Sequence, residues 1–487
     1  MAKEKTKKNK QKSDRLDTPS LSSHTSKADK KAKRARAKEI KRTMIREVKI
    51  QQKEAQAIHK MQMRTLRENW YKLDNAALIY PAIDRTGWNS VFRLTATFAE
   101  PVDTAILQSA LDDCMQRYPF YNVSLRDGLF WHYFQNLTTK PHIEPETDYP
   151  CRPFVFDKDK QIFRVLYYNS TISFETFHSL ADGGGAIQFF NTLIVRYCTL
   201  RGMEIADLAK YNLNALDLPD PEESEDAFNR YADGGRPSPR GEPKAYAITG
   251  TMEPVDILYA YTGRVDLTKL KELAKSYNAT INEFLSAVYL QVMIAEKHRT
   301  SPKDKRPVKL SVPVNLRRMF PSKTMRNFSQ FINLCIPTDS EDATFQELVD
   351  MVKEQSKVLT KDYVMGIINA NVASERNFFV RIMPLFIKDF VLNIVYSRVG
   401  ENLFTSTISN LGVISLPPEV NEYVVSYNAL LGSTKLNKIN LTVSTYNNIT
   451  SLTFTTRLRE NRLVRAFFEV LTGMGLAITM HTNRQGV

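Results

Sequence analysis

The residues best suited to catalysis in this sequence lie in one short segment, His178-Ser-Leu-Ala-Asp182-Gly183-Gly184-Gly185. An imidazole, whose pKa is near ~6.5, is the side chain that most readily takes a proton at neutral pH. Asp182, four residues later, can fold back through the turn and fix its geometry with a basic partner. The glycines let the backbone approach a ligand closely. The segment therefore predicts a general base beside a glycine-rich turn.

A simpler interpretation competes with this one, because a single histidine beside a turn is more often a structural hydrogen-bonding group than a base. The spacing favours function. A chain with seven His and ordinary amounts of Asp and Gly should contain HxxxDG by chance only roughly 0.01–0.02 times.

Hydrophobic patterning predicts regular elements on both sides of this segment. Positions 172, 174, 176 and 178 share one face of a predicted strand, so His178 is expected at the strand's end. A helix is predicted after the glycines, because apolar residues recur there at helical spacing: Ile187, Phe190, Leu193, Ile194 and Tyr197. Cys198 has apolar neighbours in the same helix and is interpreted as a core residue.

The chain from about Trp70 onward is predicted to contain two similar α/β units. In the first, a strand-like alternation over residues 91–98 leads to Asp103 and then to a helix. In the second, residues 257–261 lead through Arg264 and Val265 to Asp266 and another helix. Each Asp can accept hydrogen bonds from free backbone N–H groups at the start of its helix. The repeated pattern, offset by 163 residues, indicates a structural duplication.

We therefore expect four segments: a basic, disordered or helical extension (1–67), a first subdomain with the HxxxDG motif (68–215), a linker or surface crossover (216–250) and a second subdomain (251–487). The crossover is rich in Pro, Gly and charged residues. Three local signals refine the second subdomain: a capping box from Thr280 to Glu283, a hairpin around Asn447-Asn448 and a final helix over about 461–471.

The net charge of +14 belongs to the extension. Residues 1–68 hold 22 basic and 8 acidic residues, which leaves 45 of each in the rest of the chain. An enzyme that acts on nucleic acid would usually carry basic surface on its folded body as well, so we expect no nucleic-acid partner. The extension is predicted to be disordered over 1–27. Over 30–67 a helix-forming composition carries a thin apolar stripe, which either is solvated or contacts an anionic membrane surface.

The cysteines and the hydropathy indicate a cytoplasmic protein. The four Cys form no CxxC pair, which argues against a zinc site or a disulfide scaffold. The N-terminus lacks the apolar core of a secretory signal. The most apolar stretch, 377–398, is interrupted by Arg381, Lys388 and Asp389. We expect a location in the cytoplasm, with peripheral contact at the inner membrane surface through the extension as a further possibility.

The segment from His178 to Gly183 resembles the HxxxDG motif of the CoA-dependent acyltransferase superfamily, which includes chloramphenicol acetyltransferase and nonribosomal-peptide condensation domains. The resemblance extends over most of 68–480 and is greatest to the alcohol acetyltransferase group. Weaker matches support it by their order: Trp70-Tyr71-Lys72-Leu73-Asp74, Pro313-Val314-Asn315-Leu316-Arg317 and Ser409-Asn410-Leu411-Gly412. It implies two similar α/β subdomains of mixed sheet and helix with the active site at their interface.

Two departures narrow this resemblance. Condensation domains usually carry a second His directly before the motif, where this chain has Phe177, and no carrier-protein module is present. The superfamily also includes the plant BAHD enzymes, and their DFGWG motif is absent from this chain. Peptide condensation on tethered substrates and a plant-type assignment are therefore disfavoured.

The resemblance also implies roles for individual residues. His178 would be the general base for transfer of an acyl group, most simply acetyl, from acyl-CoA to a hydroxyl, and Asp182 would orient the loop with Arg317 as candidate partner. Ser409 or Asn410 could stabilise the oxyanion, although the same residues favour a plain turn. Gly183, Gly184 and Arg317 are candidates for substrate binding. Acyl-CoA would be a co-substrate, with no permanently bound cofactor and no metal.

Other functions remain open at this level. The motif does not separate hydroxyl from amine acceptors, so an N-acyltransferase or a condensation-like enzyme is an alternative. A non-catalytic binding or scaffold protein with the same fold is another, although the intact motif argues against it. We expect a monomer, and the sequence identifies neither the acceptor nor the acyl chain length.

Overall fold

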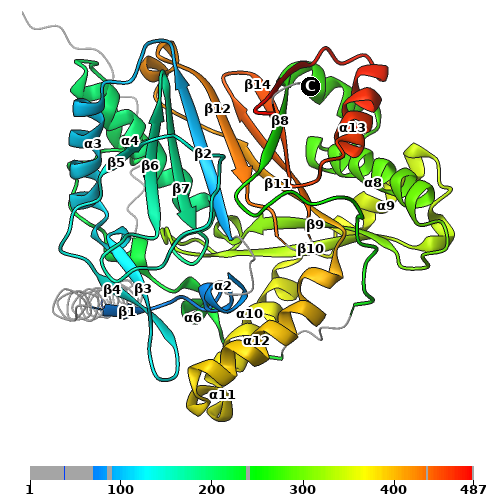
Figure 1. Ribbon diagram of the computed structural model, residues 1–487, viewed down its shortest axis with the longest axis horizontal. Helices are drawn as coiled ribbons and strands as arrows, with labels where there is room; N and C mark the ends of the chain where they lie inside the picture. Colours follow the sequence, from blue (N-terminus) through cyan, green and yellow to red (C-terminus); the bar gives the residue numbers. More distant parts are fainter. Residues whose placement is uncertain (1–37, 39–69, 85–89, 237–241, 435–436, 485–487) are drawn as a thin grey trace, which may run out of the picture. The chain divides into compact units, whose positions relative to one another are not determined.

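The computed structural model describes residue 38 and residues 70–84, 90–236, 242–434 and 437–484 (Figure 1). The predicted helix over 30–67 and the disordered segment before it lie outside the described residues, apart from Lys38. Residues from Arg67 onward form one compact unit. Within the described residues, the strands form sheets of three, five and seven strands.

The first half of the chain is built on a five-stranded sheet in the order β12-β2-β7-β6-β5. Its strands are β2 (Val91–Phe98), β5 (Ile143–Pro145), β6 (Phe163–Tyr168), β7 (Thr171–Phe177) and β12 (Val424–Leu431). A smaller sheet contains β1 (Trp70–Lys72), β4 (His132–Asn136) and β3 (Val123–Asp127). The main helices of this half are α3 (Thr104–Arg117) and α4 (Gly183–Leu200), with short helices α2 (Tyr80–Asp84) and α5 (Leu208–Tyr211).

The second half is built on a seven-stranded mixed sheet in the order β10-β9-β11-β13-β14-β8-β15. Its strands are β8 (Tyr259–Asp266), β9 (Val308–Asn315), β10 (Ser329–Ile336), β11 (Ser406–Val413), β13 (Ile439–Tyr446), β14 (Ile449–Thr456) and β15 (Thr479–Thr482). Its helices are α7 (Leu267–Ser276), α8 (Ile281–Thr300), α9 (Phe345–Ser356), α10 (Lys361–Arg376), α11 (Phe378–Ile382), α12 (Leu385–Val399) and α13 (Arg462–Gly473). The predicted mixed α/β architecture of two subdomains is present.

Local signals in the sequence correspond to the observed element ends. Asp103 accepts a hydrogen bond from the Ile106 N–H, and Asp266 accepts one from the Lys269 N–H. Thr280 and Glu283 form the predicted capping box of α8. Asn447 and Asn448 have positive φ values of 49° and 63° and connect the antiparallel strands β13 and β14, as expected of a tight hairpin turn.

One strand of the five-stranded sheet comes from the second half of the sequence. β12 pairs antiparallel with β2 along Val424–Leu431, so the predicted division at about residue 250 does not separate the two sheets. The same strand also contacts the larger sheet, because Thr455 donates a hydrogen bond to the carbonyl of Leu431 at 2.6 Å. β12 therefore joins the two halves: it pairs with β2 through backbone hydrogen bonds and accepts a side-chain hydrogen bond from Thr455 of β14.

The predicted crossover over 216–250 is partly packed rather than entirely on the surface. It contains α6 (Ala227–Tyr231), and its Glu223 is buried in an ion pair with Arg117 of α3, with N···O distances of 2.5 and 2.7 Å. The carbonyl of Glu223 also accepts the Met325 N–H at 2.7 Å. This segment thus connects α3 to the chain just before β10.

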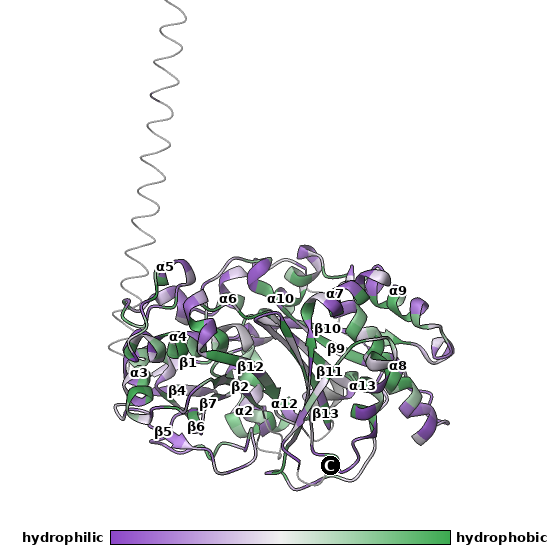
Figure 2. Cartoon of the chain, turned by 90° about the horizontal axis from the view of Figure 1, so that it is seen from above, coloured by the Kyte–Doolittle hydropathy of each residue, from purple (hydrophilic) through white to green (hydrophobic). Residues whose placement is uncertain are grey.

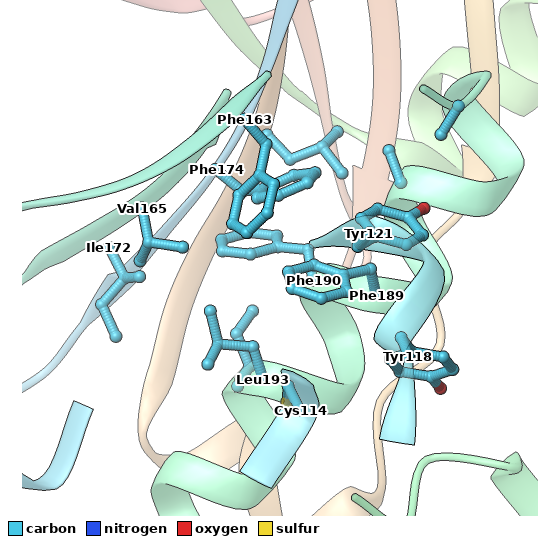
Figure 3. Packing of buried hydrophobic residues seen from close by; sticks show 14 of the residues in the cluster. Cys114, Tyr118, Tyr121, Phe163, Val165, Ile172, Phe174, Phe189, Phe190 and Leu193 are labelled. Carbon is cyan, nitrogen blue, oxygen red and sulfur yellow. The ribbon is translucent and has the colours of Figure 1, made fainter. Parts of the chain in front are cut away.

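An aromatic core fixes α4 on the five-stranded sheet (Figure 3). Phe189 stacks on Tyr121 with ring centroids 4.6 Å apart, and it contacts Phe174 of β7 at 4.8 Å. Cys198 is buried, and burial raises the pKa of its thiol to about 12. Hydrophobic residues concentrate in α4, α8 and along the strands (Figure 2). Of the helices in the described residues, none is both long and apolar enough to cross a membrane.

Candidate active site

His178 lies directly after the last residue of β7, as the alternation in the sequence predicts. Its backbone N–H donates to the carbonyl of Ser90 at 2.8 Å, and the Leu180 N–H closes the turn on the carbonyl of Phe177 at 2.9 Å. Asp182 is the N-cap of α4, where one of its carboxylate oxygens accepts the Gly185 N–H at 3.0 Å. The motif is therefore a strand end, a tight turn and a helix start.

Asp182 is held by a two-pronged ion pair with Arg317, the partner expected from the resemblance. The guanidinium Nη1 and Nη2 lie 2.8 and 3.0 Å from the two carboxylate oxygens. The Phe328 N–H donates to the same carboxylate at 2.8 Å. Burial favours a higher pKa for Asp182, but Arg317 and the N–H donors outweigh it and lower the pKa overall. Asp182 is consequently a carboxylate without a proton to give.

Arg317 has an acceptor for each of its donors. Besides Asp182, its Nε donates to the carbonyl of Thr324 at 2.9 Å, and Nη2 donates to the carbonyl of Arg326 at 2.7 Å. Nη1 also donates to Asn315 at 3.2 Å. Arg317 therefore ties the loop between β9 and β10 to the start of α4. The predicted role of Arg317 in substrate binding stays a prediction. The contacts support its other predicted role, as the partner of Asp182 in orienting the loop.

The glycines of the motif allow close packing against that loop. A Cβ on Gly185 would lie 1.7 Å from the carbonyl oxygen of Met325, and one on Gly184 would lie 3.0 Å from Nη1 of Arg317. A Cβ on Gly183 would meet the side chain of Leu411 at 3.0 Å. Glycine at these positions thus brings α4 against both the loop before β10 and strand β11.

The imidazole of His178 is fixed by a residue that the sequence analysis did not identify. Nδ1 lies 3.1 Å from Oδ1 of Asn327. The amide nitrogen of Asn327 faces two acceptors, Oδ2 of Asp74 and the carbonyl of Ser179, each at 3.3 Å. Because that nitrogen is directed to acceptors, the Asn327 oxygen faces the imidazole and accepts the Nδ1 proton. This arrangement leaves Nε2 unprotonated, the form needed in a base.

Aromatic rings flank the imidazole. Tyr80 of α2 stacks on it with centroids 4.4 Å apart, and Phe92 of β2 lies at 5.1 Å. The side chain of His178 is half-buried, and its burial lowers the pKa below the ordinary 6.5. His178 is therefore neutral at pH 7 and able to accept a proton. Burial also raises the pKa of Tyr80 above its usual range, which keeps this phenol protonated.

Asp74 completes the support of Asn327 from the opposite side. It is fully buried, accepts the Ala77 N–H at 2.8 Å and lies 3.5 Å from Nε of Arg326. Burial raises its pKa to about 6, although Arg326 acts in the opposite direction. Asp74 belongs to the segment 70–74 that resembles the acyltransferases, so a signal for it existed, but the sequence assigned it no role.

The two oxyanion candidates occupy different surroundings on β11. Asn410 donates to Asn282 at 3.3 Å and accepts the Gly412 N–H at 2.8 Å, so both ends of its amide are in use. Gly412 has a φ of +73° at an irregularity of β11. Ser409 is half-buried, and its hydroxyl has no hydrogen-bond partner in the part of the chain that the structure describes. Ser409 therefore retains a free donor, whereas Asn410 supports the turn.

The described residues contain no cluster of three or more His, Cys, Asp or Glu side chains that could hold a metal. A cavity of about 220 Å³ lies beside β5, β6 and β7 of the five-stranded sheet, lined by residues of 144–152 together with Arg164, Leu166 and Glu175. None of the motif residues lines it. The site described above depends on the junctions of β7 with α4 and of β9 with β10.

No protein-family model matches the sequence, and no curated protein is significantly similar to it. In three dimensions the chain is similar to polyketide synthase associated protein 5 from Mycobacterium tuberculosis, with a TM-score of 0.53 and 14% identity over 83% of this chain and 97% of that one. It is also similar to TRI101 of F. graminearum, solved with coenzyme A and deoxynivalenol, with a TM-score of 0.53 and 9% identity over 83% and 97% of the two chains.

A third similar structure is the starter condensation domain of rhizomide synthetase RzmA in complex with C8-CoA, with a TM-score of 0.52 and 13% identity over 84% of this chain and 95% of that domain. At such low identity these structures establish the fold alone. The chain thus has the two-subdomain fold that acetyltransferases and condensation domains share, as the motif predicts.

Proposed function

We propose that this chain is an acyl-CoA-dependent acyltransferase that transfers an acetyl group to an alcohol, with His178 as the general base. The observation that carries the proposal is the fixed imidazole: Nδ1 donates to Asn327, which leaves Nε2 as a proton acceptor in the neutral ring. The fold is supporting evidence, because similar structures include a protein solved with coenzyme A and another solved with an acyl-CoA.

In the proposed reaction, Nε2 of His178 takes the hydroxyl proton while the alcohol oxygen attacks the thioester carbon. A C–O bond forms and a tetrahedral oxyanion develops, for which the free Ser409 hydroxyl is the candidate donor. The C–S bond then breaks, and the protonated imidazole returns its proton to the departing thiolate. Atoms and charges balance without a metal or redox partner. Asp182 and Arg317 hold the turn and exchange no proton.

The amine acceptor of a condensation-like reaction is the second candidate, because condensation domains share this fold. The chemistry at His178 would be the same, with a nitrogen in place of the hydroxyl oxygen. Phe177 stands directly before the motif, where condensation domains usually carry a second His, and this difference favours an alcohol as the acceptor.

The test is incubation of the purified full-length chain with acetyl-CoA and a panel of alcohols and amines. Free thiol would be measured continuously, and products would be identified by mass. We expect thiol release that depends on an alcohol and an ester as product. Amide formation alone would favour the second candidate. Thiol release equal to that of His178→Ala with every acceptor would remove the enzymatic proposal.

A further inference from the structure

Helix α12 buries Lys388 and Asp389 and exposes several of its large apolar side chains, the reverse of an ordinary surface helix. Lys388 is 2% exposed and Asp389 is 8% exposed. Lys388 donates to the carbonyl of Phe130 at 2.6 Å, and its ammonium lies 3.2 Å from the centre of the Trp131 ring. Asp389 lies 3.0 Å from Nε2 of His132. Two of the three charges that interrupt the apolar stretch of the sequence, Lys388 and Asp389, therefore point inward, toward the hairpin of β3 and β4, whereas Arg381 is exposed.

The outward faces of α11, α12 and the loop between β3 and β4 form one apolar surface, which we call the apolar ridge. The loop belongs to it because the Leu385 N–H at the start of α12 donates to the carbonyl of Leu129 at 2.9 Å. Figure 1 shows α11 and α12 at the edge of the body, beside that loop. The exposed members are Leu129 (74%), Phe130, Phe378, Phe379 (73%), Ile382, Phe386 (73%), Ile387, Phe390, Val391 and Val395.

Few charged side chains are exposed on the apolar ridge. Beside its loop the carboxylate of Asp127 is exposed, and it lies 2.8 Å from Nδ1 of His132. Of the residues that the structure describes between 376 and 396, the only exposed charged side chains are Arg376 and Arg381. Residues 1–68 add a net charge of +14 in the same chain. A soluble surface this apolar is unusual and marks a contact. The exposed Phe and Leu side chains, with Arg376 and Arg381 beside them, fit the boundary of headgroups and acyl chains in a lipid bilayer, where the guanidinium groups meet phosphates.

The apolar ridge is connected to the candidate active site through one short helix. The Asn393 side chain of α12 donates to the carbonyl of Ala82 in α2 at 3.4 Å. The first residue of α2, Tyr80, stacks on the imidazole of His178. A single helix, about 10 Å across, therefore separates the ridge from the base.

We propose that the apolar ridge inserts into the surface of a lipid bilayer, and that the acceptor is an apolar alcohol dissolved in that bilayer. The identity of the acceptor rests on the proposed function, whereas insertion of the ridge does not. An alcohol that partitions into the membrane would enter the site beside α2 without crossing water. The chemical step is the one given above, with the proton of the lipid-phase hydroxyl passing through His178 to the CoA thiolate.

Vesicle sedimentation of the full-length chain tests the insertion. Neutral phosphatidylcholine vesicles at about 0.5 M salt are the probe, because screening there suppresses attraction by the basic extension. The triple variant Phe379→Ser, Phe386→Ser, Phe390→Ser should lose at least about tenfold in vesicle affinity. The matched control replaces three exposed apolar residues elsewhere, Tyr168→Ser, Leu216→Ser and Leu218→Ser, and should sediment as the native chain does.

Equal sedimentation of the native chain and the Phe triple variant would overturn the proposal. So would a native chain that stays in solution as a dimer that the triple variant dissociates, because the ridge would then cover a second copy. Circular dichroism and thermal unfolding of each variant establish that its fold is intact. All three Phe side chains are exposed, so the substitutions should leave the melting temperature unchanged.

The acceptor class is tested with two alcohols of different solubility. 1-Hexadecanol in the same vesicles should be acetylated by the native chain at least about tenfold faster than by the Phe triple variant, while both act equally on a short, water-soluble alcohol. Equal rates on vesicle-borne hexadecanol would overturn the acceptor assignment. Failure of both proteins with every alcohol would instead reject the proposed function, and the sedimentation result would still decide the insertion.

Discussion

Two strand-to-helix junctions of this chain have the same kind of Asp cap, but only one of them also positions a candidate catalytic residue. At the junction of β8 with α7, Asp266 is the last residue of the strand and accepts the Lys269 N–H at 2.9 Å. At the junction of β7 with α4, Asp182 accepts the Gly185 N–H at 3.0 Å, but four residues separate it from the strand. Those four residues begin with His178. The additional turn thus provides the position for the base.

The two aspartates also differ in what lies around them. Asp266 is half-buried, and its second contact is the side chain of Asn448 at 2.8 Å. Asp182 is 3% exposed and is paired with Arg317, which lies 135 residues later in the sequence. A cap can be formed by local residues alone, whereas a buried ion pair requires the second half of the chain. The comparison indicates that the HxxxDG motif is a local helix cap with an additional ion pair to Arg317, a residue distant in the sequence.

Removal of His178 should have the largest effect on activity. His178→Ala deletes the proton acceptor, so we expect kcat to fall by roughly 10²–10⁴. The melting temperature should change little, because the side chain is only half-buried. The measurement is thiol release from acetyl-CoA with a soluble alcohol. His142→Ala, which changes an exposed histidine, is the control and should keep the native rate. A His178→Ala chain with half the native kcat would show that His178 is not the base.

Replacing Asp182 or Asp266 by Ala should lower the free energy of unfolding by different amounts. Asp182→Ala removes the buried carboxylate and leaves the half-buried Arg317 guanidinium without its counter-charge, which should lower the free energy of unfolding by roughly 3–5 kcal/mol. Asp266→Ala removes only a cap and should lower it by about 0.5–2 kcal/mol. Urea unfolding of both variants measures the difference. Equal losses would mean that the ion pair with Arg317 adds nothing to the cap, and an inactive Asp182→Ala of native stability would indicate direct proton transfer by Asp182.

Asn327 is predicted to position the imidazole, since its oxygen accepts the Nδ1 proton. Asn327→Ala should lower kcat by about tenfold, which corresponds to roughly 1.4 kcal/mol, the value of one hydrogen bond to the charged ring. Asn327→Asp places a carboxylate at Nδ1 and should raise the pKa of His178, which moves the acid limb of the rate profile to higher pH. A purely structural role would leave that limb where it is in the native chain.

The sequence predicted the local features and missed the contacts made over long distances. The caps at Asp103 and Asp266, the capping box at Thr280 and the hairpin at Asn447-Asn448 follow from neighbouring residues, and all are present. The pairing of Asp182 with Arg317 came from the resemblance, not from spacing.

The partners that the sequence did not provide are those brought together by the tertiary fold. Asn327 lies 149 positions after His178, and Asp74 lies 253 positions before Asn327. Their residue types carry no periodicity that links them. The pairing of β12 with β2 was missed for a similar reason, because pairing between strands that are distant in the sequence leaves no pattern in either segment alone.

The smallest expected effect is the change in the native rate with pH. In this profile His178 should produce an acid limb and Asp182 should produce none. Burial lowers the pKa of His178 below 6.5, so more than half of the free enzyme carries a neutral imidazole at pH 6.5. The value of kcat/KM should therefore change by less than about twofold between pH 6.5 and 8, and it should fall at lower pH as the base becomes protonated. Asp182 contributes no limb in this range, because Arg317 holds its pKa below that of an ordinary carboxyl group. Thiol release at low acyl-CoA concentration measures the profile. A limb centred above pH 7 would contradict a base whose pKa is lowered by burial, and would require a group other than the His178 imidazole.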